Sequence, residues 1–362
     1  MTKNAYIHIP FCKQKCNYCS FVSFVSQNKQ AEYVNALCNE IKYRYKGELL
    51  DTLYFGGGTP SLLSIEEIKQ ILEHLNFNQN TEVTFEANPE TLTVEYLEEL
   101  KKLGINRLSL GCQTFNPDIL NIIGRKHSPQ DVIQTVKIAQ NIGFNNINLD
   151  FIYGLPTQTI EEFSSDLRKA ASLGIQHISL YGLKIDEGCV FYKKTPANLP
   201  DSDMQADMYL KAIDVLTSLG FEHYEISNFS KSGFESKHNL NYWNNNSYYG
   251  FGVAAHGYEN GTRYSNTTNI KKYLENPHEH AFENKLTKQA KLEEAIFLGF
   301  RKMDGIDIQT INSQYRINFD EKYNNIIKKY IQSGHLIKTN NGYKLSNTGI
   351  LVSNYILSDF LD

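Results

Sequence analysis

The chain has 362 residues, of which 41% are hydrophobic, so it is long enough for one large domain and a second, smaller one. Its formal net charge of -4 at pH 7 gives no basic field of the kind that nucleic-acid binding needs, and no apolar run approaches a membrane span. Six cysteines in this length are too few for a disulfide framework, so we expect a soluble, cytoplasmic protein with no nucleic-acid partner and no integral membrane segment; peripheral membrane contact stays open.

The first predicted strand, residues 6–9, leads into three closely spaced cysteines. Cys12, Cys16 and Cys19 have the spacing C-x3-C-x2-C, which leaves a four-ligand metal site one protein ligand short. This spacing favours an iron-sulfur cluster in which one iron is open to another ligand. An alternative is a structural zinc site that uses the same cysteines with His8 as the fourth ligand.

Helices and strands then alternate along the chain. The predicted helices cover residues 29–46, 65–75 and 94–103, and the predicted strands cover residues 53–55 and 82–86. Ser64 and Glu67 form a candidate capping box at the start of the second helix. From residue 102 the alternation becomes a repeat, in which an amphipathic segment ends at a glycine suited to a helix C-cap and a short strand follows. The four glycines are Gly104, Gly143, Gly174 and Gly220.

Strands that alternate with helices of this length imply parallel pairing with right-handed crossovers. The sequence therefore predicts an α/β fold, a TIM-type (βα) barrel or partial barrel of at least six units, with a doubly wound open sheet as the structural rival. Barrel active sites gather at the C-terminal ends of the strands. The six predicted strands all end in polar, glycine or cysteine residues, which a barrel would bring to one rim.

A glycine run, Gly56 to Gly58, follows the second predicted strand and continues into Thr59 and Pro60. The run lacks the Lys-Ser/Thr sequel of a phosphate loop and does not match the dinucleotide fingerprint. Glycines allow the backbone to approach a bound group closely, so we expect the run to form the floor of a cofactor site. A simple turn is the alternative.

The cysteine segment together with the glycine-rich second strand resembles the radical S-adenosylmethionine (SAM) superfamily. Cys12, Cys16, Tyr18 and Cys19 match its hallmark, C-x3-C-x-aromatic-C. The resemblance implies that the three thiolates hold a [4Fe-4S] cluster, that SAM binds the open iron, and that reduction cleaves SAM to a 5'-deoxyadenosyl radical.

Within the superfamily, nearly the whole chain resembles the group that includes oxygen-independent coproporphyrinogen III oxidase. Carboxylates at the rim can accept hydrogen bonds from the SAM ammonium or ribose hydroxyls, and an arginine can pair with its carboxylate. The residues that the resemblance assigns to SAM are Tyr6, Tyr18, Gly57, Gly58, Thr59, Glu86, Gln113, Arg125 and Asp150. The oxidase has a further cysteine in a C-x-C pattern, whereas this chain has Ser20 and Phe21 after Cys19.

The segment His238-Asn239-Leu240-Asn241-Tyr242-Trp243 resembles the H-N-x-x-Y-W motif of related haem chaperones. This resemblance implies that His238, Tyr242 and Trp243 contact haem, because histidine is a common axial ligand and aromatic rings pack against a porphyrin. The alternative is a loop histidine bonded to the backbone. His256, in a later glycine-rich segment, is a second and weaker candidate.

The barrel signature stops near residue 283, so we expect a barrel domain with the haem-motif extension over residues 1–283 and a second domain over 284–362. An amphipathic helix near 292–301, a helix near 322–332, a hairpin turn at Asn340-Asn341-Gly342 and a final helix from Thr348 predict a winged-helix-like α+β module. Its lysines form no basic stripe, so a docking or lid role over the barrel is favoured over DNA binding.

Three functions compete at this point. The first is a haem chaperone that keeps the cluster and SAM sites, binds haem and passes it to an unidentified acceptor protein. The second is a coproporphyrinogen III oxidase, and the third is a zinc-stabilised barrel without redox chemistry. The absence of the oxidase's extra cysteine, together with the motif at 238–243, favours the first.

Overall fold

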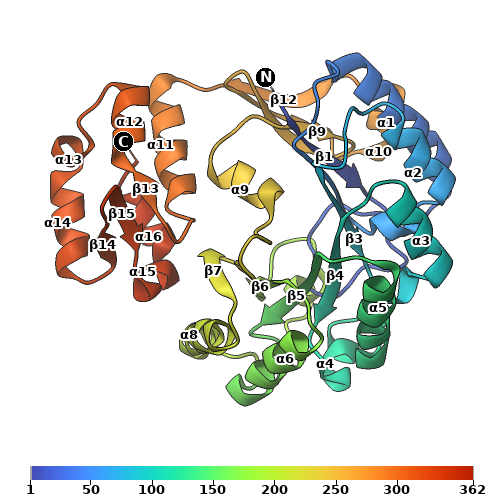
Figure 1. The fold of residues 1–362 in the computed structure, drawn as a ribbon, viewed down its shortest axis with the longest axis horizontal. Helices are drawn as coiled ribbons and strands as arrows, with labels where there is room; N and C mark the ends of the chain where they lie inside the picture. Colours follow the sequence, from blue (N-terminus) through green and yellow to red (C-terminus); the bar gives the residue numbers. More distant parts are fainter. Residues whose placement is uncertain (1, 362) are drawn as a thin grey trace.

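The computed structural model describes residues 2–361 and contains a curved, mostly parallel sheet with helices on its outer side (Figure 1). The strand order is β7-β8-β6-β5-β4-β3-β2-β1-β9, and neighbouring strands from β1 to β6 are parallel. The strands are β1 (Asn4–Ile9), β2 (Thr52–Gly57), β3 (Glu82–Ala87), β4 (Arg107–Gln113), β5 (Ile147–Tyr153), β6 (His177–Gly182), β7 (Glu222–Glu225), β8 (Asn228–Ser230) and β9 (Tyr249–Phe251). The expected α/β partial barrel is confirmed.

Helices between the parallel strands form the outer layer (Figure 1). They are α1 (Gln30–Arg44), α2 (Ile65–Leu72), α3 (Val94–Lys102), α4 (Pro117–Ile122), α5 (Pro129–Ile142) and α6 (Ile160–Ser172), and α8 (Ser202–Ser218) follows β6 after the short α7 (Val190–Lys193). The capping box of Ser64 and Glu67 is present at the start of α2. Gly104 and Gly143 adopt the left-handed conformation expected of glycines at helix ends, with φ of 93° and 100°.

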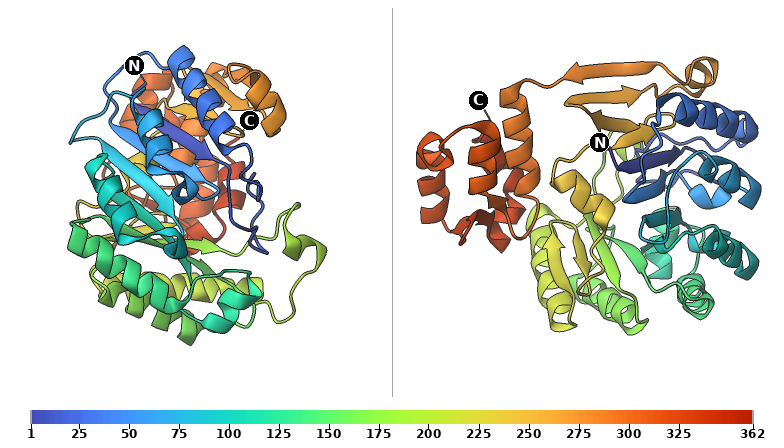
Figure 2. Two further views of the ribbon diagram at one scale, coloured as in Figure 1. Left: turned by 90° about the vertical axis from the view of Figure 1, so that its right-hand side faces the viewer. Right: turned by 45° about the horizontal axis from the view of Figure 1, so that its top comes forward.

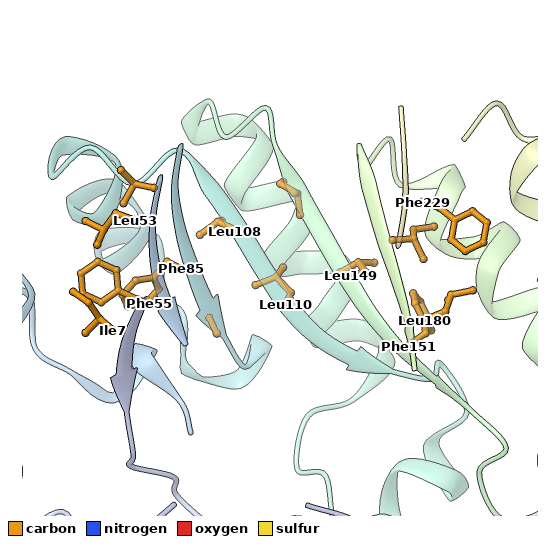
Figure 3. Packing of buried hydrophobic residues seen from close by; sticks show 14 of the residues in the cluster. Ile7, Leu53, Phe55, Phe85, Leu108, Leu110, Leu149, Phe151, Leu180 and Phe229 are labelled. Carbon is orange, nitrogen blue, oxygen red and sulfur yellow. The ribbon is translucent and has the colours of Figure 1, made fainter. Parts of the chain in front are cut away.

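The main core lies between the sheet and these helices. Alternate residues of the central strands, such as Leu53, Phe55 and Leu149, are fully buried on one face of the sheet (Figure 3). Their neighbours in sequence, such as Tyr54 and Asp150, face the inside of the barrel and are largely polar. Polar side chains of these strands therefore face the barrel interior, and apolar side chains pack against the helices.

The fourth copy of the helix-glycine-strand repeat does not extend the parallel barrel. After Gly220 the chain enters β7, which pairs antiparallel with β8, and β8 pairs antiparallel with β6. The four copies share the same pattern of an apolar residue, a glycine and a short strand, so the long-range pairing is what distinguishes the last one. The six-unit barrel is thus bordered by a hairpin on the β6 side and by β9, parallel to β1, on the other.

The segment after β8 supplies elements that the barrel pattern does not predict. Helix α9 (Lys237–Trp243) lies inside the curve of the sheet (Figure 1). Strands β10 (His256–Glu259), β11 (Thr262–Asn266) and β12 (His280–Lys285) form an antiparallel sheet, with α10 (Ile270–Glu275) between the last two. This sheet joins the β1 side of the barrel to the C-terminal region (Figure 2).

The C-terminal region combines helices with a small antiparallel sheet of order β13-β15-β14. Its elements are α11 (Lys288–Gly299), β13 (Ile306–Asp307), α12 (Ile308–Tyr315), α13 (Phe319–Lys322), α14 (Asn324–Gln332), β14 (Leu336–Lys338), β15 (Gly342–Leu345), α15 (Asn347–Leu351) and α16 (Ser353–Ser358). The hairpin turn predicted at Asn340-Asn341-Gly342 joins β14 to β15. Within residues 2–361, the helices are all too short or too polar to span a bilayer.

Candidate functional site

A cavity of about 470 Å3 opens at the C-terminal ends of the barrel strands. This cavity brings together residues from the cysteine loop and from β2 to β5 that are far apart in sequence. The predicted site residues that line it are Cys12, Cys16, Tyr18, Cys19, Gly57, Gly58, Thr59, Glu86, Gln113, Arg125 and Asp150. Tyr6 is the one residue of the predicted SAM set that does not line it.

The three cysteines lie on a loop that backbone hydrogen bonds hold in place. Cys12 N donates to Phe24 O at 3.1 Å, and Cys19 N donates to Cys16 O at 3.1 Å. Two side chains contact the sulfurs: Thr59 Oγ1 lies 3.6 Å from Cys12 Sγ, and Arg125 Nη1 lies 3.7 Å from Cys16 Sγ. Three thiols facing one cavity, beside a hydroxyl and a guanidinium donor, form a donor set that fits a cluster with one iron left open.

The glycine run makes close contact with the start of the cysteine loop. Gly57 has a φ of +115°, and a Cβ atom there would lie 2.6 Å from the His8 ring. A Cβ atom at Gly58 would lie 2.7 Å from Phe11 O, and Gly58 N donates to Ile9 O at 2.8 Å. These glycines therefore allow the end of β2 to pack against the chain that leads to the cysteines, besides lining the cavity.

Glu86, on β3, is a buried carboxyl group held by two donors. Tyr54 Oη donates to Oε1 at 2.7 Å, and Gly57 N donates to Oε2 at 3.2 Å. The pKa of Glu86 is raised to about 7, chiefly by burial and also by the neighbouring Asp150 carboxylate, while the Tyr54 hydrogen bond acts in the opposite direction. This group can therefore exchange a proton near neutral pH or accept hydrogen bonds from a bound cation.

Asp150, on β5, faces the same cavity. Asn148 Nδ2 donates to Oδ1 at 2.8 Å, and Ser109 Oγ donates to Oδ2 at 3.3 Å. Burial raises the pKa of Asp150 as well, while its hydrogen bonds act in the opposite direction.

Gln113 reaches the rim because the register of β4 shifts between Gly111 and Gln113. The chain bulges there, and Gln113 has a φ of 68°.

Arg125 connects the cysteine loop to the strand ends. Its Nη2 donates to Asn88 Oδ1 and to Gly111 O, each at 2.7 Å, while Nη1 points to Cys16. Among the described residues, its buried Nε has no hydrogen-bond partner. The guanidinium thus keeps a donor for a further acceptor at the cavity wall.

Tyr6 and His8 lie together on β1. Tyr6 Oη and His8 Nδ1 are 3.1 Å apart, and His8 Nε2 is 3.1 Å from Val22 O. Burial lowers the pKa of His8 to about 4. Both imidazole nitrogens are therefore engaged within the protein, and within residues 2–361 no three His, Cys, Asp or Glu side chains are arranged to hold a single metal ion.

Further polar and aromatic residues line the cavity beyond those that the sequence assigned to the cluster or to SAM. Among them are Tyr54 and Ser109, and also Asn88 and Tyr181, which the sequence placed at strand ends without a role. The signal that could have found them is register, because Tyr54, Glu86, Ser109 and Asp150 occupy the inward-facing positions of four neighbouring strands. Tyr181 lies at the carboxyl end of β6 and remains 45% exposed.

The predicted haem motif forms helix α9, which contacts the first residues of β2 and β3, whereas the cysteine loop follows the last residue of β1. His238 is 1% exposed and stacks on Tyr54, with ring centroids 5.0 Å apart. Its Nδ1 lies 2.7 Å from Thr52 Oγ1 and its Nε2 lies 2.8 Å from Tyr242 Oη. Burial lowers the pKa of His238 to about 3. The motif therefore adjoins Glu86, one of the predicted SAM residues, through Tyr54, but it does not line the cavity.

The other candidates for haem contact have separate surroundings. Tyr242 is held against the imidazole of His238. Trp243 lies at the end of α9, and the Arg301 guanidinium stands 4.6 Å from the centre of its ring. His256 is exposed at the start of β10, and no contact brings it to the α9 motif. In this structure His238, Tyr242, Trp243 and His256 therefore do not come together in one open haem site.

Comparison with known proteins gives two family matches and several close relatives. Residues 6–170 match the radical SAM superfamily, and residues 286–352 match the HemN C-terminal domain. The heme chaperone HemW of Bacillus subtilis is 38% identical, over 99% of this chain and 99% of its own length. The heme chaperone HemW of Lactococcus lactis is 37% identical, over 99% of this chain and 97% of its own length.

The fold also matches a solved enzyme structure. Coproporphyrinogen III oxidase (HemN) from Escherichia coli, a radical SAM enzyme, superimposes with a TM-score of 0.87, covering 99% of this chain and 90% of the other. The two sequences are 24% identical, so this match establishes the shared fold alone.

Proposed function

Because this chain belongs to the HemW family of haem chaperones within the radical SAM superfamily, we propose that it binds haem and transfers it to an acceptor protein. The observation that carries the proposal is the match along almost the entire chain to relatives that bear this name, the segment 238–243 included. We propose that the protein works in the cytoplasm and that its acceptor is a protein yet to be identified.

The cluster and SAM sites of the proposal rest on the cavity at the strand ends. Cys12, Cys16 and Cys19 would hold a [4Fe-4S] cluster, whose chemistry with bound SAM is one-electron cleavage of the sulfonium group. Thr59 and Arg125 supply donors toward two of the sulfurs. Such donors stabilise negative charge on cluster ligands.

The remaining cavity residues would orient SAM. Glu86 and Asp150 supply carboxylate oxygens for its ammonium and ribose hydroxyls, while Gln113 can donate or accept. Arg125 offers a guanidinium donor for the SAM carboxylate. Tyr6 lies outside the cavity lining and supports His8, so we propose an indirect role for Tyr6.

The residues of the haem motif do not fit haem ligation in the folded arrangement. His238 is buried, and both of its ring nitrogens have hydrogen-bond partners. For this imidazole to ligate iron, α9 would have to leave the barrel interior and give up the bond to Thr52 or to Tyr242. We therefore propose no iron ligation by His238 or Tyr242, and we propose a contact role for Trp243 beside Arg301.

The oxidase remains the second candidate function, because the SAM residues shared with that group all meet in one cavity except Tyr6. Its substrate would be coproporphyrinogen III, whose propionate side chains lose carbon dioxide. The single C-x3-C-x2-C run without a further C-x-C cysteine is the feature that argues against it.

One preparation tests these functions. The protein is purified without oxygen, reconstituted with iron and sulfide, and titrated with haem while its absorption is recorded. We expect a cluster and a haem-dependent Soret shift, and no turnover of coproporphyrinogen III with SAM and a reductant. Substitution Cys16→Ala should abolish the cluster, whereas Cys189→Ser, which keeps the helix cap at Tyr192 N, should not. A protein that holds zinc and no cluster, or that turns over the porphyrinogen without binding haem, would contradict the proposal.

A further inference from the structure

A second cavity, of about 460 Å3, lies where the barrel meets the C-terminal region. Its walls come from the ends of β5 and β6, from α8, from the turn between β7 and β8, and from α15. The lining residues on which the inference depends are Tyr153, Tyr181, Ala206, Ile226, Arg301 and Leu351. Tyr181 and Gly182 also line the cysteine cavity, so the two cavities adjoin.

Backbone pairing across the junction fixes the walls of this second cavity. Ile226 N donates to Arg301 O at 2.9 Å, and Met303 N donates to Tyr224 O at 3.1 Å. Glu225 forms an antiparallel bridge with Lys302. The chain that follows α11 is thus hydrogen-bonded to the barrel edge, which makes the cavity a preformed feature of the fold.

Arg301 is the one cation among the described residues that line the cavity. Its guanidinium packs over Trp243, the last residue of the motif helix, and its buried Nε has no hydrogen-bond partner within residues 2–361. The nearby Glu225 balances the positive charge of Arg301 only in part. Burial raises the pKa of the Glu225 carboxyl to about 7, so this group is partly protonated at neutral pH. The Arg301 Nε is shielded from the cavity, but Arg301 lines the cavity, so its guanidinium can pair with an anionic group bound there.

The rest of the lining combines apolar and polar groups. Tyr153 and Tyr181 contribute aromatic rings, Ile226 and Leu351 contribute aliphatic side chains, and the polar residues are Ser202, Gln205 and Ser227. Haem combines broad apolar faces with two carboxylates at one edge. Arginine pairs with carboxylates in bidentate fashion, and aromatic rings pack on planar ligands.

We propose that this junction cavity is the haem site and that Arg301, held in position by Trp243, pairs with a haem propionate. The inference rests on the proposed haem-chaperone function and adds the location of the ligand. It also gives the 238–243 motif a physical role: His238 fixes α9 inside the barrel, and α9 carries Trp243 to the arginine.

The test compares haem with haem dimethyl ester, which keeps the iron and the ring but lacks free carboxylates. Each is titrated into the reconstituted full chain in the same buffer, with the Soret shift as readout. Arg301→Gln should weaken haem binding roughly ten- to hundredfold, the value of a charged hydrogen bond, and change ester binding by less than about threefold. Arg168→Gln, which changes an exposed arginine on α6, is the matched control and should bind both like the parent.

Two further variants test the location and the role of the tryptophan. Ala206→Trp fills the cavity from α8 and should weaken both haem and its ester. Trp243→Leu should weaken haem as Arg301→Gln does, and Trp243→Phe should restore much of the affinity, because the aromatic face under the guanidinium is retained.

These experiments distinguish an error in the proposed haem site from an error in the proposed haem-chaperone function. If the parent binds haem but Arg301→Gln binds it equally well, or loses haem and ester equally, the assignment of Arg301 is wrong while the chaperone function stands. Full haem affinity in Ala206→Trp excludes the junction cavity. If the parent itself binds no haem, the proposed function fails.

Discussion

His238 Nδ1 lies 2.7 Å from Thr52 Oγ1, so a residue of the motif helix is bonded to the first residue of the second barrel strand, 186 positions earlier in the chain. Thr52 Oγ1 also donates to Asn4 Oδ1 at 2.9 Å. The threonine proton is therefore used, and the network assigns the proton of His238 to Nδ1, leaving Nε2 to accept from Tyr242 Oη at 2.8 Å. A neutral imidazole is thus built into the barrel interior.

Substitution Thr52→Val should destabilise the protein. It removes the acceptor of His238 Nδ1 and leaves a buried donor unsatisfied, so we expect the free energy of unfolding to fall by about 1–3 kcal/mol. Denaturant unfolding of the parent and the variant measures this difference. Thr52→Ser keeps the hydroxyl and should lose less; equal losses in the two variants would show that the methyl group, not the hydrogen bond, matters.

The stability contributed by His238 should depend on pH. Burial lowers its pKa to about 3, against 6.5 for the ordinary group, so the unfolded chain takes up a proton that the folded chain does not. Stability should therefore fall as the pH drops from about 6.5 towards 3, by up to about 1.4 kcal/mol per pH unit from this residue.

Unfolding free energies at several pH values in this window compare the parent with His238→Gln, which cannot be protonated there. The variant should show a shallower dependence on pH than the parent. Parallel dependences would mean that His238 is already charged in the folded protein, contrary to the assigned hydrogen bonds.

SAM affinity should increase through neutral pH. Burial raises the pKa of Glu86 to about 7, so this carboxyl is protonated below that value and cannot then accept from an ammonium group with both oxygens. We expect up to about a tenfold loss of affinity per unit as the pH falls below 7. Equilibrium binding of SAM to the reconstituted protein at pH 6 to 8 measures it.

Substitution Glu86→Gln is the control for that pH profile. The amide does not titrate, so the variant should bind SAM weakly and with little change over the same range. If the variant keeps the dependence of the parent, another group is responsible, and Asp150 is the next one to change, since burial raises its pKa as well.

Glu40 should be one of the most sensitive positions for stability. It is fully buried in α1 and accepts from Arg44 Nη1 at 2.8 Å, Tyr273 Oη at 2.6 Å, Asn266 Nδ2 at 2.7 Å and Gly252 N at 2.7 Å. Glu40→Ala should lower the free energy of unfolding by about 3–5 kcal/mol, because Arg44 and the other donors lose their acceptor.

The control is Glu99→Ala on α3, which breaks an exposed ion pair with Lys102 whose N to O distance is 2.6 Å. That variant should change stability by at most about 1 kcal/mol. Denaturant unfolding of both variants gives the comparison. A similar small effect at both positions would mean that the Glu40 carboxylate is dispensable for joining α1 to the segment after β9.

Much of the barrel could be predicted from the sequence because its signals are local. Gly104 and Gly143 end helices, and Ser64 with Glu67 begins one, and each does so through residues within a few positions of itself. The position of β7, which β8 separates from β6, could not be predicted, because the residues after Gly220 read like those after Gly174. Only pairing with β8 distinguishes them.

The sheet of β10 to β12 was missed for a related reason. Strand β12, His280–Lys285, is exposed along most of its length, so its sequence has no alternation of apolar and polar residues that would predict a strand.

The difference between local and distant signals also applies to the candidate site. The rim residues could be predicted from motifs at strand ends, whereas the burial of His238 depends on Thr52 and Tyr54, which no local pattern connects to it.

The pairing of β1 with β9 sets an order for biosynthesis. β1 precedes the cysteine loop, yet one of its two neighbours, Tyr249–Phe251, is translated more than two hundred residues later. Until then β1 is an edge strand, and Glu40 lacks its bonds to Gly252 and Asn266. Contacts so distant in sequence form late in folding. The three cysteines proposed to hold the cluster therefore reach their final scaffold only after the segment at β9 has been synthesised, so we expect cluster insertion to be a late step in maturation.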